Sequence, residues 1–155
     1  MKIEIKELSP IEVYSVRKTG PYKVAASEAF GELMPFAYGK RLMTPETRMF
    51  GIGHDDPSIT DGEKIRYDAC LTRDVAVEPP EGIQLLTIQG GLHAIALHKG
   101  PYEALVESYD MLIGTWLSEN DRELRDEPLF EEYLNRDPRK TKPENLRTLI
   151  CIPIK

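Results

Sequence analysis

The amino-acid sequence predicts an α+β domain that is built from two copies of one strand–helix–strand–strand unit. Three landmarks recur in the same order at a nearly constant offset, which indicates an internal duplication. The tripeptide Gly-Pro-Tyr at residues 20–22 returns 80 residues later at 100–102. Strand-like residues run into an Asp-Pro turn at Pro57 and again at Pro138. The segments "KIRYDAC" and "NLRTLIC" end at two cysteines that are 81 residues apart.

The repeats extend over about residues 1–77 and 82–155, and the Pro-rich segment 78–82 joins them. With 155 residues the chain has the length of one ordinary domain and can bury a sizeable core. We therefore expect a single domain over residues 1–155, with the duplication inside it.

Each Gly-Pro-Tyr tripeptide is expected to form a corner between a strand and a helix. The preceding segments, "IEVYSVRK" and "HAIALHK", are rich in β-branched and apolar residues, as strands are. Glycine is accepted at a helix N-cap, and proline is favoured at the first helical position because its missing N–H costs nothing there. Both prolines are accordingly predicted at that first position.

The two helices that follow differ in how clearly the sequence predicts them. The first carries small apolar residues as far as Leu33, and Pro35 should stop or kink it, because an interior proline costs roughly 3 kcal/mol. The second has a clean apolar stripe at helical periodicity. The stripe consists of Tyr102, Leu105, Val106, Tyr109, Leu112, Ile113, Trp116 and Leu117.

Two strands are predicted after each helix, and extra strands at residues 2–7 and 83–89 precede each unit. One unit alone would expose an apolar face, so two units related by a pseudo-twofold axis would bury it. The expected architecture is a mostly antiparallel sheet with the two main helices on one side.

Composition excludes several classes of protein. The formal net charge of −6 argues against a dedicated nucleic-acid-binding protein, because phosphate binding needs clustered Lys and Arg. No stretch approaches the roughly 20 apolar residues of a membrane helix, and the N-terminus lacks the apolar core of a signal peptide. Cys70 and Cys151 lie in apolar runs, which does not suggest a disulfide scaffold. We expect a cytoplasmic protein with neither a membrane nor a direct nucleic-acid partner.

Four segments together resemble the GyrI-like small-molecule-binding family: "HKGPYEALVESYDMLIGTWL", "DDPSITDGEKIRYDAC", "PLFEEYLNRDP" and "ENLRTLICIPI". This family includes the effector-binding domains of AraC-type and MerR-type multidrug regulators and stand-alone DNA gyrase inhibitors. The resemblance implies a pocket between the two halves that binds amphipathic, often cationic aromatic compounds. Because the first predicted strand starts at residue 2, the chain is expected to be a stand-alone member.

The pattern Phe-Glu-x-Tyr in "PLFEEYLN" resembles the pocket strand of the family, which implies Glu131 as the pocket carboxylate and Tyr133 as an aromatic wall. The two side chains share a face at a spacing of two residues. From the residues alone, Glu132 on the other face remains an alternative.

Further ligand-binding candidates are the aromatic residues Tyr67, Tyr109 and Trp116, although such residues are more often ordinary core. His93 stands where the family commonly has an aromatic residue and is included as a candidate. Gly51 and Gly53 lie 80 residues before Glu131 and Tyr133, and we hypothesise that these glycines leave open the volume that the acid and the tyrosine line; a bulge or bend is the alternative.

No metal site or cofactor site is expected. His93 and His98 are an odd number of residues apart and therefore point to opposite faces of one strand. The acidic segment 55–63 lacks the spacing of a calcium loop, and no phosphate-binding glycine loop is present.

The favoured function is binding of a hydrophobic, cationic or polyaromatic small molecule for sensing or sequestration, with Glu131 as the counter-charge. One alternative is a hydrolase of electrophilic cyclopropane-type DNA-alkylating compounds, in which Glu131 and Tyr133 would be catalytic. Another is inhibition of DNA gyrase by direct contact. The residues themselves do not separate these possibilities.

Overall fold

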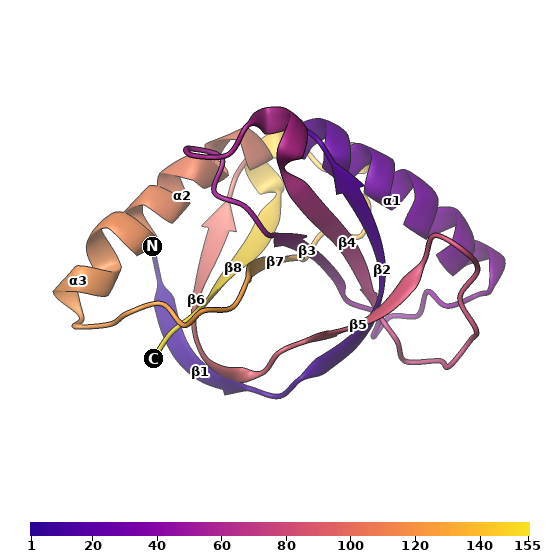
Figure 1. Ribbon diagram of the computed structural model, residues 1–155, viewed down its shortest axis with the longest axis horizontal. Helices are drawn as coiled ribbons and strands as arrows, with labels where there is room; N and C mark the ends of the chain where they lie inside the picture. The colour runs from indigo at the N-terminus through magenta and orange to yellow at the C-terminus, as the bar shows by residue number, and fades with distance from the viewer. The chain divides into compact units, whose positions relative to one another are not determined.

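The computed structural model describes residues 1–155 and divides the chain into two compact units. The N-terminal unit is Ser9–Gln89, and the C-terminal unit is Met1–Leu8 together with Gly90–Lys155. Each unit has four antiparallel strands and one main helical segment, so the predicted α+β class is confirmed (Figure 1). No helix is long and apolar enough to cross a membrane.

In the N-terminal unit the helix covers one face of the sheet, whose strand order is β3-β4-β2-β5. Ala25, Ala29 and Leu33 of the helix are fully buried against strand residues such as Val16 and Ala69. The elements of this unit are β2 (Ile11–Thr19), α1 (Tyr22–Gly39), β3 (Met49–Gly53), a 3₁₀ turn (Gly62–Lys64), β4 (Arg66–Thr72) and β5 (Gln84–Ile88).

Pro35 does not end the first helix, which was one of the two effects predicted from the sequence. α1 continues past Pro35 to Gly39, and Ala37 in its last turn is fully buried. Burial of the small apolar stripe on the sheet therefore outweighs the loss of one helical hydrogen bond at the proline.

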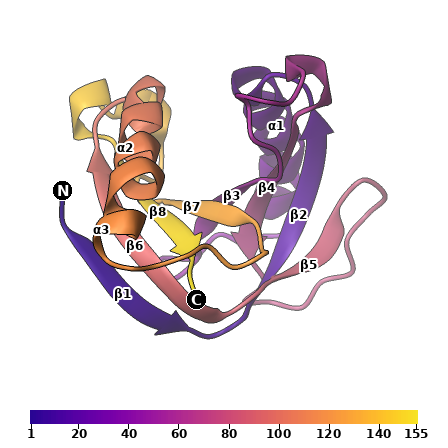
Figure 2. The ribbon, with the colours of Figure 1, turned by 60° about the vertical axis from the view of Figure 1, so that its left-hand side comes forward.

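The C-terminal unit has the sheet order β1-β6-β8-β7, with the helical segment lying over β6 and β8 (Figure 2). Its elements are β1 (Ile3–Leu8), β6 (Gly91–Lys99), a 3₁₀ turn (Tyr102–Ala104), α2 (Leu105–Met111), a π-helical turn (Leu112–Trp116), α3 (Leu117–Glu119), β7 (Leu129–Tyr133), 3₁₀ turns at Pro138–Lys140 and Pro143–Asn145, and β8 (Arg147–Pro153).

The π-helical turn changes which residues of this segment reach the core. The buried positions are Leu105, Ser108, Leu112 and Leu117, so the spacing widens to five residues across the turn. The predicted stripe was wrong in part: Val106 is 60% exposed and Ile113 is 39% exposed. The stripe in the sequence is wider than the surface that the sheet can cover.

Both Gly-Pro-Tyr corners have the same geometry. Gly20 and Gly100 have φ angles of 143° and 140°, a region that side chains with a Cβ avoid. Their N–H groups donate to the carbonyls of Ile65 and Leu146, in each case at 2.8 Å. The prolines occupy the N-cap and not the first helical position, because the chain turns into the helix one residue later than expected.

The first strand of each repeat pairs with a strand of the other repeat. β1 lies beside β6 in the C-terminal unit, and β5 lies beside β2 in the N-terminal unit. Pro10 is in the two-residue link between β1 and β2, where the absence of an N–H interrupts strand pairing. The compact units consequently differ at their ends from the repeats 1–77 and 82–155.

The strand register confirms which residues of the two repeats are equivalent. In the N-terminal unit Ala69 pairs with Val16 on one side and with Gly51 on the other. In the C-terminal unit Ile150 pairs with Ala96 and with Glu131. Gly51 and Glu131 therefore hold the same place in their respective sheets.

Candidate functional site

Strand β7 turns Glu131 toward the helix-covered face of the C-terminal sheet. Glu131 pairs with Ile150, a fully buried residue of the core cluster that also contains Leu105 and Leu112 of the helical segment. Phe130 and Glu132 alternate with Glu131 and point to the other face. The side chain of Glu131 is partly buried, between the apolar core and solvent.

Two tyrosine hydroxyls donate hydrogen bonds to this carboxylate. The Tyr109 hydroxyl lies 2.6 Å from Oε2, and the Tyr133 hydroxyl lies 2.9 Å from Oε1. Tyr109 comes from α2 and Tyr133 from the same strand as the acid, so the structure brings together three of the residues singled out in the sequence. Glu132 is 9% exposed on the opposite face, apart from this cluster.

The pKa of Glu131 is raised above the ordinary value of a glutamic acid. Burial is the main cause, because it disfavours the charged form. The hydrogen bonds from Tyr109 and Tyr133 favour the carboxylate and offset part of this effect, as does the charge interaction with His98. Burial therefore disfavours ionisation of Glu131, while the hydroxyl groups of Tyr109 and Tyr133 are in place to stabilise the ionised form.

A buried pair, His98 and Ser108, adjoins the acid and was not anticipated from the sequence. His98 Nδ1 lies 2.8 Å from Ser108 Oγ, and Nε2 lies 3.1 Å from the carbonyl oxygen of Pro101. His98 is 7% exposed and Ser108 is 6% exposed. The spacing of ten residues between them carries no recognisable signal, since it depends on the corner between β6 and α2.

Tyr102 of the second Gly-Pro-Tyr motif stands beside the site. Its ring meets the ring of Tyr133 edge to face, with centroids 5.8 Å apart. Burial raises the pKa of Tyr102, and the charge of Glu131 raises it further. The equivalent Tyr22 instead donates its hydroxyl to the carbonyl oxygen of Asp55, at 2.7 Å. The motif thus supplies an aromatic residue near the acid only in the C-terminal unit.

Trp116 is partly buried and packs on the core cluster of the C-terminal unit. The π-helical turn gives the fully enclosed position to Leu117, which is 8% exposed, so Trp116 lies at the margin of the core. Its role in ligand binding stays a prediction.

Tyr67 belongs to the core of the N-terminal unit. It is 5% exposed, and its ring centroid lies 6.3 Å from that of Tyr22 and 6.4 Å from that of Phe30. The residue opposite it in the sheet is Gly53. A ligand-binding role for Tyr67 stays a prediction, as does one for Gly51.

The space above Gly53 is filled, which corrects the hypothesis that this glycine leaves an open volume. A Cβ atom at Gly53 would lie 2.6 Å from the Tyr22 hydroxyl oxygen. The ring of Tyr22, from the first Gly-Pro-Tyr motif, occupies the space that a side chain at this position would need.

His93 lies on the sheet face opposite Glu131 and therefore outside the cluster. Its ring meets Phe130 edge to face at 5.5 Å, and Nδ1 lies 2.8 Å from the carbonyl oxygen of Gly91. Burial lowers the pKa of His93, which is 1% exposed. As predicted, His93 and His98 point to opposite faces of β6.

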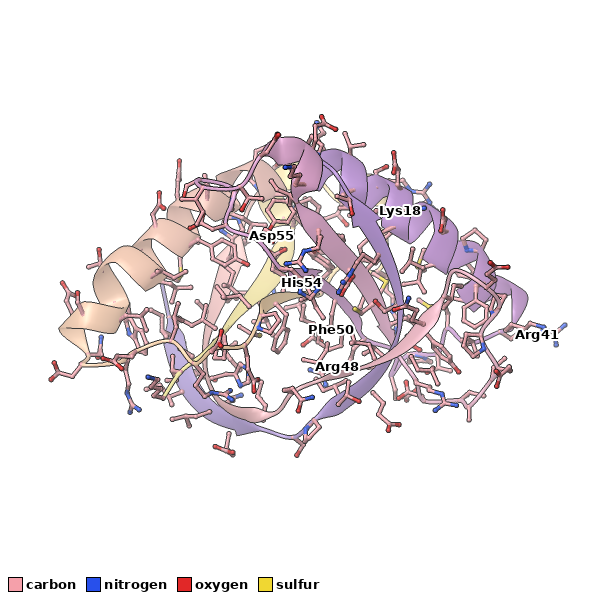
Figure 3. The ribbon with its side chains drawn as sticks, viewed as in Figure 1. Lys18, Arg41, Arg48, Phe50, His54 and Asp55 are labelled. Atoms are coloured by element: carbon pink, nitrogen blue, oxygen red, sulfur yellow. The ribbon has the colours of Figure 1, made fainter.

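The N-terminal unit has a separate polar cluster around Asp68, on the face away from α1. Arg17 binds Asp68 with both Nε (2.8 Å) and an Nη (3.0 Å), and His54 Nε2 lies 2.7 Å from Oδ2. Burial opposes ionisation of Asp68, yet the hydrogen bonds from His54 and Arg17 bring its pKa below the usual value. His54 and Asp55 follow one another directly after β3 (Figure 3), and Asp55 pairs with Arg66 at 2.8 Å. The charged side chains of this cluster pair with one another, which indicates a structural role.

Comparison with known proteins identifies the family. The sequence profile of the GyrI-like small molecule binding domain matches residues 1–155. The chain belongs to this family. It is 27% identical over 138 residues to the DNA gyrase inhibitor of Escherichia coli K12, covering 87% of each protein. The resemblance noted in the sequence is thereby confirmed.

Two solved structures illustrate the same fold in other proteins. The C-terminal domain of EcmrR superimposes with a TM-score of 0.79 at 20% identity, covering 99% of this chain and 97% of that one. A structure of SAV2435 bound to tetraphenylphosphonium matches with a TM-score of 0.64 at 15% identity, covering 100% of this chain and 94% of that one. These likenesses show the fold. No group of three or more His, Cys, Asp and Glu side chains is arranged to hold a metal ion.

Proposed function

We propose that this GyrI-like protein binds an amphipathic organic cation, whose charge pairs with Glu131. The proposal rests on the hydrogen-bond partners of the Glu131 carboxylate. Both are neutral hydroxyl groups, those of Tyr109 and Tyr133, and no basic side chain forms an ion pair with the carboxylate. A partly buried carboxylate without a cation is costly, so a cationic ligand would relieve the cost on arrival.

The energetics favour charge over shape as the basis of selection. At an effective dielectric constant near 20, a cation 4 Å from the carboxylate gains roughly 4 kcal/mol before desolvation is subtracted. Contact of the cation with an aromatic face such as that of Tyr102 adds about 0.5–2 kcal/mol. The neighbour SAV2435, described as bound to tetraphenylphosphonium, offers a precedent for a cation in this fold.

The test is a displacement assay with a fluorescent dye and three matched aromatic compounds, one cationic, one neutral and one anionic. In the wild type the cation should bind most tightly, and Glu131→Gln should weaken cation binding about tenfold or more while leaving the neutral compound unaffected. Glu144→Gln, at an exposed position, is the matched control. Equal binding of anions and cations would exclude Glu131 as the determinant.

Hydrolysis of an electrophile is a second candidate, favoured by the 2.6 Å contact between the Tyr109 hydroxyl and Glu131. The carboxylate would take a proton from water as the water oxygen bonds to the electrophilic carbon of a strained ring. The broken ring bond would leave its electron pair on the substrate, which Tyr109 would protonate, and Glu131 would return a proton to Tyr109. Turnover that is lost in Glu131→Gln while a neutral substrate still binds would establish this activity; unchanged turnover would exclude it.

Contact with DNA gyrase is supported by the relative in Escherichia coli that bears the name DNA gyrase inhibitor. A supercoiling assay with purified gyrase and increasing amounts of this protein tests the idea. Supercoiling that is unchanged at a large molar excess would rule it out for this chain.

A further inference from the structure

Thr148 holds a polar atom that the fold itself leaves unsatisfied. The residue is 0% exposed, and its Oγ1 atom has no hydrogen-bond partner. Most buried hydroxyl groups are paired, because an unpaired one costs about 1–3 kcal/mol. Such an atom in a native structure calls for an explanation, and its position provides one.

The strand register places this hydroxyl in the row next to Glu131. Thr148 pairs with Tyr133 on one side and with His98 on the other, so the three side chains share the helix-covered face. Glu131 pairs with Ile150, two residues further along β8. Thr148 and Glu131 are therefore diagonal neighbours on one face, about 7–8 Å apart in the strand geometry.

The neighbours of Thr148 are already engaged. Both ring nitrogens of His98 have partners, Ser108 Oγ and the carbonyl oxygen of Pro101. The Tyr133 hydroxyl donates its hydrogen to Glu131. The unsatisfied hydroxyl of Thr148 thus lies on the diagonal from a carboxylate and makes no hydrogen bond with these neighbours.

We propose that Thr148 selects the head group of the ligand by accepting a hydrogen bond from an N–H of the cation that pairs with Glu131. This inference rests on the proposed function and names its substrate class: aromatic compounds with a primary or secondary ammonium group or an amidinium group. A nitrogen whose N–H bonds diverge at about 110–120° and whose hydrogen bonds are about 2.9 Å long can join two oxygens up to about 5 Å apart, so the Glu131 carboxylate has to lean toward Thr148 from the wider diagonal spacing. Quaternary ammonium and phosphonium ions have no N–H and leave Thr148 unpaired.

The discriminating experiment uses (1-naphthylmethyl)ammonium and its N,N,N-trimethyl analogue, which share the aromatic group and the charge. Isothermal titration of the wild-type protein should show about tenfold to hundredfold tighter binding of the compound with N–H groups, as expected for hydrogen bonds from a charged donor. Thr148→Val keeps the shape and removes the hydroxyl, and the ratio of the two affinities should fall several-fold, to the part that N–H donation to Glu131 supplies. Thr148→Ser keeps a hydroxyl and should keep the preference.

The outcomes separate this inference from the proposal on which it rests. A preference that is undiminished in Thr148→Val would assign it to Glu131 or to exclusion of the methyl groups by size and would overturn the role of Thr148. Equal binding of both cations by the wild type, lost in Glu131→Gln, would overturn it while leaving cation binding in place. Affinities that do not change in Glu131→Gln would overturn both.

A stability measurement provides an independent readout. Removal of an unpaired buried hydroxyl should leave the free protein as stable as before or more stable, so the melting temperature of Thr148→Val should not fall. Thr47→Val is the matched control: Thr47 is 6% exposed, and its hydroxyl accepts from Thr44 N at 2.9 Å and donates to Leu42 O at 3.1 Å. The control should melt several degrees lower. A comparable fall in Thr148→Val would show that a bound water already satisfies the hydroxyl, which contradicts the inference.

Discussion

The hydroxyl oxygen of Tyr109 lies 2.6 Å from Oε2 of Glu131, a separation typical of an O–H group that donates to an ionised carboxylate. This contact joins helix α2 to strand β7 within the C-terminal unit. It also shows how the site keeps an acid in a setting that disfavours its charge, because the donor comes from a helix that the core holds in place.

Replacing Tyr109 with Phe should weaken cation binding and reduce stability together. The change removes a donor that favours the carboxylate, so the pKa of Glu131 should rise further. The free energy of unfolding should decrease by about 1–2 kcal/mol, as for loss of a hydrogen bond to a charged group. Urea unfolding and titration with the naphthyl cation measure the two effects.

Tyr38→Phe is the control for Tyr109→Phe, because Tyr38 is 63% exposed on α1. It should change neither quantity. If Tyr109→Phe behaved like Tyr38→Phe, the hydrogen bond to Glu131 would be irrelevant to both folding and binding.

Cation affinity should rise with pH through the raised pKa of Glu131. The cation pairs with the ionised form, and burial makes that form less populated at a given acidic pH than it is for an ordinary glutamate. Below the pKa the affinity should fall by up to about tenfold per pH unit, and above it the affinity should level off. The trimethylammonium probe suits this measurement, since its own charge does not titrate.

The Glu131→Gln variant should show a flat pH profile with the same probe. A sloping profile in this variant would assign the titration to another group. A flat profile in the wild type would mean that Glu131 stays ionised throughout, against the effect of its burial.

The sequence predicted the fold and the acid at the centre of the site better than the surroundings of the acid. Periodicity and the repeat offset depend on neighbours along the chain, and they located the strands and the helices. The pair Glu131 and Tyr133 came from the resemblance to the family, and the structure joins the two residues by a hydrogen bond. The position that holds Glu131 in the C-terminal unit holds Gly51 in the N-terminal unit, and this equivalence also followed from the repeat offset.

What the sequence could not provide depends on register between strands far apart in the chain. Thr148 lies beside His98 and Tyr133 only because β8 is the strand between β6 and β7. The exposure of Val106 and Ile113 follows from a π-helical turn, which no apolar pattern indicates. The persistence of α1 through Pro35 is likewise a result of packing, which outweighs a local preference.

Asp68→Asn should destabilise the N-terminal unit at neutral pH by about 1–3 kcal/mol, since it removes the charge that Arg17 and His54 share. The folded-state pKa of Asp68 lies below its unfolded value of about 3.9. The stabilisation is therefore fully present above that unfolded value and is lost as the pH falls through the folded one. The wild type and the variant should converge in stability on acidification, as measured by urea unfolding at pH 7 and pH 3.

Asp126→Asn, at an exposed position, serves as the control and should unfold like the wild type at both values. A constant difference between wild type and Asp68→Asn at both pH values would contradict the assignment, because packing and not charge would then be responsible.

Alanine substitutions at two glycines should have opposite effects on stability. At Gly53 the new Cβ would lie 2.6 Å from the Tyr22 hydroxyl oxygen, which donates to the Asp55 carbonyl at 2.7 Å. The rigid ring must move and lose that bond, so Gly53→Ala should cost about 1–3 kcal/mol. At Gly31, inside α1, a Cβ meets nothing within 4 Å, and Gly31→Ala should stabilise the protein by about 0.5–1 kcal/mol.

A double-mutant cycle identifies the cause at Gly53. Tyr22→Phe removes the hydroxyl oxygen, so the cost of Gly53→Ala should be smaller in that background, with a coupling of about 1 kcal/mol or more. If the two changes were additive, contact with Tyr22 would not be the reason for the glycine, and its backbone freedom within the strand would be. The cycle thus decides between a packing requirement and a conformational one at the position that Tyr133 occupies in the other repeat.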